Sequence, residues 1–152
     1  MISATITLGG ANAALDGLPP QVIEAVAKKV RALTLGLQRH IVADKLQGQV
    51  LHHRSGDLGR SIGLSSSAVT TTEGTTTTGE VWNSGDVKYA AIHEFGFHGI
   101  ESCVSVLGTP FTRNVNYPER SFMRSSLEDH AEMIVAEIRA AAEAGAKQSL
   151  GG

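Results

Sequence analysis

The stretch PPQVIEAVAKKVRALTLGLQRHI, residues 19–41, decides the fold that this sequence predicts. Its two prolines stand where a helix would begin, because proline is tolerated at the first helical position. Apolar residues then recur every three or four positions, namely Ile23, Val26, Val30, Leu33, Leu37 and Ile41. This spacing puts them on one face of an amphipathic helix of about six turns. We expect the helix to end near Gly48.

A second helix is predicted near the C-terminus, from Ser121 or Ser125 to about Gly145. Its buried stripe is expected to hold Leu127, Ala131, Ile134, Ile138 and Ala141. Ser125 and Glu128 have the spacing of a capping box at the start of this helix. The tail, residues 145–152, is expected to fray.

Short strands and turns fill the rest of the chain. Residues 2–8 alternate between apolar and polar side chains, which predicts a half-buried strand. The Ser/Thr-rich tract from Ser65 to Thr78 predicts a β-hairpin that turns at Glu73-Gly74, with Trp82 on its second strand. Both faces of this hairpin are polar near the tip, so we expect it to project and its register to be weakly specified.

Three smaller elements are predicted around that hairpin. Ser55 is placed to cap a short turn that contains Leu58 and Ile62. Residues 89–95 predict a short helix that ends at Gly96. Residues 100–107 and 111–115 predict two more strands, and Pro118 ends that pattern.

The order of these elements indicates one α+β domain over residues 1–152. Because most strands are joined by short turns, the sheet is expected to be mostly antiparallel. The long N-terminal helix and the C-terminal helix should pack on one face of it, and the Ser/Thr-rich hairpin should project.

Composition narrows the possible functions. The 152 residues carry 41% hydrophobic side chains and a formal charge of −2, which argues against an extended basic surface for nucleic acid. The single cysteine, Cys103, rules out an internal disulfide. No apolar run reaches the length of a membrane span, and no signal peptide is visible, so we expect a soluble protein made in the cytoplasm.

One group of residues invites a metal site. His93, Glu94 and His98 resemble the metalloprotease pattern. In that pattern, however, the two histidines lie at positions i and i+4 of one helix. Here the two histidines are five positions apart and Gly96 interrupts the helix between them. A small His/Glu metal-dependent hydrolase is therefore kept only as an alternative, and no metal, cofactor or catalytic residue is predicted. Cys103 is interpreted as a small, partly buried side chain of a strand.

Three segments resemble a known protein family. They are RSGDLGRSI (54–62), KYAAIHEFG (88–96) and YPERSFMRSSL (117–127), and together they cover less than a third of the chain. In this order and spacing they resemble the minor tail proteins of the tail-completion, or head–tail joining, group of long-tailed bacteriophages. The Ser/Thr-rich hairpin departs from the family, because it is longer and more uniform than expected.

The resemblance implies a structural virion protein without a catalytic role. Such proteins form homo-oligomeric rings, usually hexamers, at the neck. A head connector or stopper protein lies on one side of the ring, and a tail terminator or tube protein lies on the other. DNA passes through the channel without specific binding, and no membrane is involved. The ring would be assembled in the host cytoplasm, and a tail terminator that caps the tube is the alternative within the same class.

Large side chains in the resembling segments are candidates for packing or subunit contacts. Tyr89, Phe95 and Phe122 are apolar anchors among small residues, and Trp82, Arg120 and Arg124 complete the candidate set. For Phe122 and Leu127 a place in the core of one subunit is favoured, whereas for Tyr89 core and interface remain open. Arg120 and Arg124 have Glu119 and Glu128 nearby, which favours salt bridges over phosphate contacts.

Overall fold

The computed structural model describes residues 3–7, 18–49, 56–71, 74–87 and 89–150. Arg54, Ser55, Glu73 and Lys88, which entered the predictions, lie outside these ranges. The elements, in chain order, are β1 (Ser3–Thr7), α2 (Pro20–His40), the π-helix η1 (Ile41–Gln49), α3 (Asp57–Arg60), β2 (Ile62–Thr71), β3 (Gly74–Asn83), α4 (Tyr89–Phe95), β4 (Phe97–Val104), β5 (Pro110–Tyr117) and α5 (Met123–Leu150).

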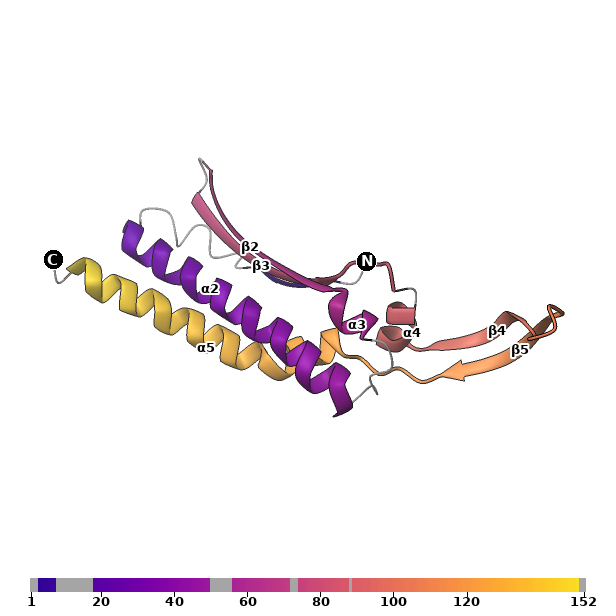
Figure 1. The fold of residues 1–152 in the computed structure, drawn as a ribbon. Helices are drawn as coiled ribbons and strands as arrows, with labels where there is room; N and C mark the ends of the chain where they lie inside the picture. The colour runs from indigo at the N-terminus through magenta and orange to yellow at the C-terminus, as the bar shows by residue number, and fades with distance from the viewer. Residues whose placement is uncertain (1–2, 8–17, 50–55, 72–73, 88, 151–152) are drawn as a thin grey trace.

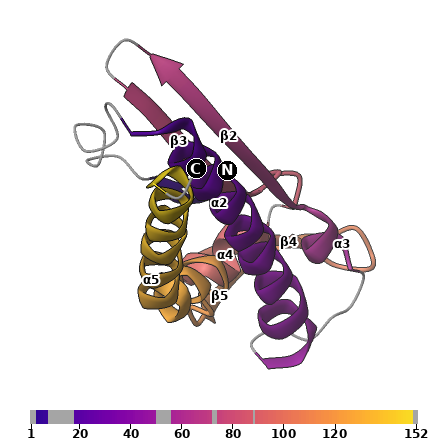
Figure 2. The ribbon, with the colours of Figure 1, turned by 90° about the vertical axis from the view of Figure 1, so that its left-hand side faces the viewer.

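The chain has the predicted α+β architecture with antiparallel strands. A three-stranded sheet in the order β1-β3-β2 lies over α2, and α5 runs along the same helical layer (Figures 1 and 2). The strands β4 and β5 form a separate two-stranded sheet that extends away from this body. None of the described helices combines the length and the apolar character that crossing a bilayer requires.

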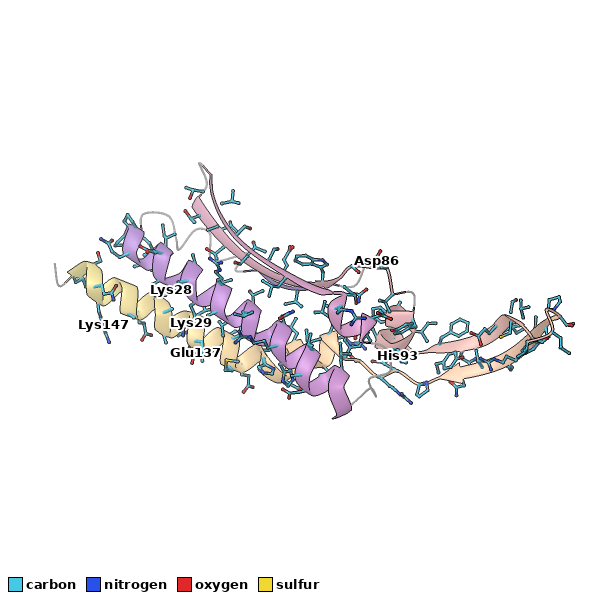
Figure 3. All side chains as sticks on the ribbon, viewed as in Figure 1. Lys28, Lys29, Asp86, His93, Glu137 and Lys147 are labelled. Carbon is cyan, nitrogen blue, oxygen red and sulfur yellow. The ribbon has the colours of Figure 1, made fainter. Side chains whose placement is uncertain are left out.

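The long helices α2 and α5 pack closely against each other. Val22, Val26 and Val30 of α2 are buried, as are Ile134 and Ile138 of α5. A Cβ atom on Gly145 would lie 2.7 Å from Val22 Cα, so the glycine allows the two helices to approach closely there. At the edge of this contact Lys29 Nζ lies 2.7 Å from Glu137 Oε2, and Figure 3 shows these two side chains between the helices.

The glycine at 145 corrects the predicted end of the C-terminal helix. Gly145 does not stop α5, which continues to Leu150, so residues 145–150 are helical. Gly145 is buried, and its role is to let the helices meet. Within the predicted stripe of α5, Ala131 is exposed, while Ile134, Ile138 and Ala141 are buried and Leu127 is partly buried.

The Ser/Thr-rich hairpin β2–β3 covers α2. Thr75, Thr77 and Val81 of β3 are buried, although two of the three are polar. A Cβ atom on Gly79 would overlap Thr34 Oγ1 of α2, so the strand lies directly on the helix there. The hairpin diverges from α2 toward its tip (Figure 1).

Several predicted ends of strands and turns differ by a few residues from those in the structure. Gly74 is already the first residue of β3, because it pairs with Thr71, so the turn was predicted one residue too late. Ile62 begins β2 and does not belong to the short turn α3. The strand predicted at 100–107 is β4, which begins at Phe97 and ends at Val104. The reason is that apolar Val106 and Leu107 were counted as strand residues although they lie beyond the last pair, Val104 and Pro110.

Candidate functional site

The hairpin formed by residues 97–117, which we call the arm, stands apart from the rest of the molecule (Figure 1). Its strands pair from Phe97 opposite Tyr117 to Val104 opposite Pro110. Apart from pairing with each other, neither strand packs extensively on any other element of the described chain. Both faces of the arm are therefore free of extensive contacts within the described chain, and a two-stranded hairpin by itself is only marginally stable in water.

Large apolar side chains of the arm are exposed. Ile100 is 72% exposed, Val104 is 70%, and Leu107 at the tip is 92%. Phe97, Val106 and Phe111 are exposed as well. The tip, residues 102–112, contains no charged residue. Several large apolar side chains exposed on one small element are typical of interaction sites in folded proteins.

One polar group braces the middle of the arm. Glu101 and Arg113 are direct cross-strand partners, and Arg113 donates to Glu101 Oε2 from both Nε (2.9 Å) and Nη2 (2.7 Å). Tyr117 Oη donates to the same oxygen at 3.3 Å. The hydrogen bond from Arg113 lowers the pKa of the Glu101 carboxyl. The brace therefore neutralises the charges of the arm within the arm itself.

The base of the arm, consisting of α4, Gly96 and residues 118–124, is called the root below. Its centre is Glu94, whose side chain is completely buried. Glu94 Oε2 accepts from the backbone N–H groups of Phe122 (2.8 Å) and Met123 (3.0 Å). Glu94 Oε1 accepts from the backbone N–H of Arg124 (2.9 Å) and the hydroxyl of Ser121 (3.0 Å). One carboxylate from a distant helix therefore accepts from three of the free N–H groups at the start of α5. The next one, the N–H of Ser125, donates to the Ser121 hydroxyl at 3.1 Å.

This arrangement corrects the predicted capping box. Ser125 lies inside α5, where its hydroxyl donates to Ser121 O at 2.6 Å. The cap comes instead from Glu94, 27 residues before Ser121 in the chain. Local spacing had suggested Ser125 and Glu128, but a tertiary contact supplies a stronger, charged acceptor.

The two ends of the arm lie next to each other at Gly96. This residue has φ 71°, which favours glycine, and it ends α4 as predicted. A Cβ atom here would lie 2.9 Å from Glu119 N and 3.0 Å from Tyr117 O. Near this contact the N–H of Arg120 donates to His93 O at 2.7 Å. The outgoing and returning chains are thus held together by backbone contacts.

His93 lies at the root, between α4 and the returning chain (Figure 3). Burial lowers the pKa of its imidazole, and the nearby positive charge of Arg120 lowers it further. Its ring meets the ring of Tyr89 edge-on, with 5.7 Å between centroids.

Five of the six candidate residues meet at the root. Phe122 is fully buried, in agreement with a place in the core, and Leu127 packs against that core. Tyr89 (42% exposed) and Phe95 (57%) reach the surface. The Arg124 guanidinium lies 5.7 Å from the centre of the Phe95 ring and also pairs with Glu119, while Arg120 is exposed.

Trp82 is the sixth candidate and lies elsewhere, on β3 opposite Gly63. Its ring covers Gly63 so closely that a Cβ atom there would lie 2.7 Å from ring carbons. Because Val81 faces α2 and side chains alternate along a strand, Trp82 is on the face of the sheet that points away from the helices.

The first resembling segment reaches the same region. An open groove of about 660 Å³ is lined by Asp57 and Arg60 of α3, by Asp86 and Val87, and by Tyr89 of α4. Behind it Ser61 O accepts from Ser84 N at 2.9 Å, and Asn83 Nδ2 donates to Ser61 Oγ at 2.6 Å. All three resembling segments therefore contribute residues to the root and its surroundings.

The residues of the alternative metal site have separate environments. Glu94 caps α5 with both oxygens, His93 is on α4, and His98 is exposed on β4 opposite Asn116. In the described part of the chain, no three His, Cys, Asp or Glu side chains gather as a metal-binding group. Cys103 is half-buried on β4 opposite Phe111.

Sequence reasoning missed two features of this site. It treated Glu94 only as a potential metal ligand, and no local signal indicates the capping role, because Glu94 and the start of α5 are remote in sequence. It also did not use the absence of charge across residues 102–112, although depletion of charge is typical of the centres of protein–protein interfaces. No family model, curated protein or solved structure matches this chain.

Proposed function

We propose that this chain is a structural virion subunit that forms a ring at the head–tail joint of a tailed bacteriophage. It would complete the tail, join it to the head connector and leave a channel for DNA. The proposal rests first on the three segments at residues 54–62, 88–96 and 117–127, which resemble the tail-completion group.

A single observation carries the proposal furthest. The second and third segments meet through Glu94, which binds the N–H groups of Phe122, Met123 and Arg124. Residues that characterise the resemblance thus orient an uncovered apolar arm relative to the longest helix. A rigidly oriented arm suits a protein that binds a neighbouring subunit. It provides no reacting group of the kind that an enzyme needs.

The chemistry of the arm also favours assembly. Ile100, Val104 and Leu107 would each contribute about 1.5 to 3 kcal/mol on full burial. The arm and the body of one subunit are different surfaces, so contact between them in neighbouring copies is heterologous. Heterologous contacts generate closed rings when the rotation between copies closes.

The test combines solution mass with location in the particle. Mass photometry of the purified chain, alone and after incubation with tails or connectors, should show one closed oligomer. Labelled protein should then appear at the neck of tailed particles in electron micrographs. A location at the end of isolated tail tubes before head joining would favour the tail terminator.

A matched pair of variants connects the test to the arm. Replacing Leu107 with Ser should abolish the oligomer and leave the helical circular dichroism unchanged, because the side chain is exposed in the monomer. The control is Val135→Ser on the outer side of α5, which is also exposed. A chain that stays monomeric in every mixture, and is absent from the neck, would overturn the proposal.

A further inference from the structure

The larger sheet has a long open edge at β2. In the order β1-β3-β2, this strand pairs on one side with β3 and has no described strand on the other. It is ten residues long, and Ile62–Thr71 contains neither a charged residue nor a proline. The side chains of Ser65, Ser67 and Val69 are exposed.

Such an edge is unusual in a protein that works alone. Monomeric proteins protect edge strands with charges, prolines, bulges or a covering element, because free N–H and C=O groups attract further strands. β2 contains neither a charged residue nor a proline. An open groove of about 360 Å³ between Ser66, Ala68 and the α2 residues Ala27 and Lys28 leaves room beside this edge.

The arm presents a strand that matches this edge. β4 is eight residues long, contains no proline, and is open along the side that does not pair with β5. Its last three residues, 102–104, carry no charge, and Glu101 is paired with Arg113. Because β2 has no charged residue either, pairing the two strands would bury no unpaired carboxylate.

The arm of one chain cannot reach its own β2. The arm leaves the body at the α4 end, while β2 and β3 run toward the opposite end of α2 (Figure 1). Any pairing between them is therefore between two copies. The contact would be directional, since each copy offers an arm to one neighbour and an edge to another.

We propose that β4 of the arm adds to the open edge of β2 in the next copy of this chain. The inference rests on the proposed ring function and specifies its subunit interface. Backbone hydrogen bonds would fix the register, and Ile100 and Val104 would be covered by the neighbouring subunit.

A lipid surface is the competing partner for an apolar hairpin. Membrane-binding segments combine apolar side chains with Lys or Arg and often Trp. Residues 97–117 contain no Lys and no Trp, and their one arginine, Arg113, is bound to Glu101. The composition of the arm therefore favours a protein partner.

The single natural cysteine makes a direct test possible. Cys103 lies on β4, so a cysteine placed on the outer face of β2 should form an intermolecular disulfide with it. Variants that carry Ser65→Cys, Ser67→Cys or Val69→Cys together with Cys103→Ser cannot cross-link through the native thiol. Each would be mixed with the native chain under mild oxidation and analysed by non-reducing electrophoresis and peptide mass spectrometry.

We expect disulfides between Cys103 and one or two neighbouring outer-face positions. The matched control is Ala144→Cys with Cys103→Ser, on the exposed side of α5, which should give none. A Cys103–Cys103 disulfide in the native chain would instead show arms pairing with arms and overturn the proposal. Native chain that floats with anionic vesicles in a Leu107-dependent manner, without β2 cross-links, would also overturn it.

A charge on the edge gives a second, independent readout. Val69→Lys should raise the concentration for half-assembly at least about tenfold, as charged edge strands resist pairing. Ala144→Lys is its control. A ring that forms normally with Val69→Lys and without β2 cross-links would refute this interface and leave the ring proposal standing. A chain that never oligomerises would refute the ring proposal itself.

Discussion

The protein contains two antiparallel hairpins with different surroundings. The β2–β3 hairpin is polar in sequence, yet Thr75, Thr77 and Val81 are buried. The β4–β5 arm is richer in large apolar residues, yet Ile100 and Val104 are exposed. The comparison teaches that hydrophobicity alone did not decide which hairpin is covered. The first lies on α2, whereas the arm is held mainly at its root.

The largest effect is expected from the root of the arm. Glu94→Ala would leave the N–H groups of Phe122, Met123 and Arg124 without their acceptor in a buried site. We expect a loss of about 3 to 5 kcal/mol in the free energy of unfolding, measured by urea denaturation. Glu119→Ala, at the exposed pair with Arg124, is the control and should change stability by less than about 0.5 kcal/mol. Equal effects of both substitutions would contradict the capping role.

The next largest effect is expected from replacing one glycine in each hairpin with alanine. Gly79→Ala pushes a methyl group into Thr34 of α2 and should cost about 3 kcal/mol, whereas Gly99→Ala in the arm meets only the exposed Phe97 ring, 3.1 Å away. Gly99→Ala should therefore change the free energy of unfolding by less than about 1 kcal/mol. Adding Thr34→Ala should restore part of the stability lost in Gly79→Ala. If Gly79→Ala is neutral in thermal denaturation, β3 does not lie on α2 as described.

Truncating one valine in each hairpin gives a smaller effect. Val81→Ala removes two methyl groups from the core and should destabilise the chain by about 2 kcal/mol. Val104→Ala removes the same atoms from an exposed site and should leave the monomer within about 0.5 kcal/mol of the native chain. Chemical denaturation at low concentration measures both. A large loss for Val104→Ala in the monomer would mean that the arm is covered within one chain.

The smallest effect is expected on the stability of the arm at acidic pH. Because the folded-state pKa of Glu101 is lowered by Arg113, the brace contributes stability above the ordinary value of 4.5 and loses it as pH falls through the lower folded pKa. We expect amide resonances of the arm to shift as the pH falls below 4.5. Glu101→Gln should abolish this acid-dependent shift, and high salt should weaken it. An unchanged acid response in Glu101→Gln would assign it to another group.

Much of the fold followed from local patterns. The three-and-four spacing from Ile23 to Ile41 fixed the long N-terminal helix, and the β-branched residues of the Ser/Thr tract fixed a hairpin. Gly96 ended α4 because a positive φ favours glycine. Local spacing could not decide Gly145 or Ser125. Their roles depend on α2 and on Glu94, which are remote in sequence.

Of the candidate site, sequence alone selected Tyr89, Phe95, Phe122, Arg120 and Arg124, which meet at the root. It also determined that the tip of the arm carries no charge, since that is a property of composition. Only the tertiary structure decided that Glu94 is a cap, that Trp82 lies apart from the root, and that the apolar arm is left uncovered. The physical reason is that burial and capping depend on which distant segments meet. A segment carries its own periodicity and charge, but not the identity of its neighbours.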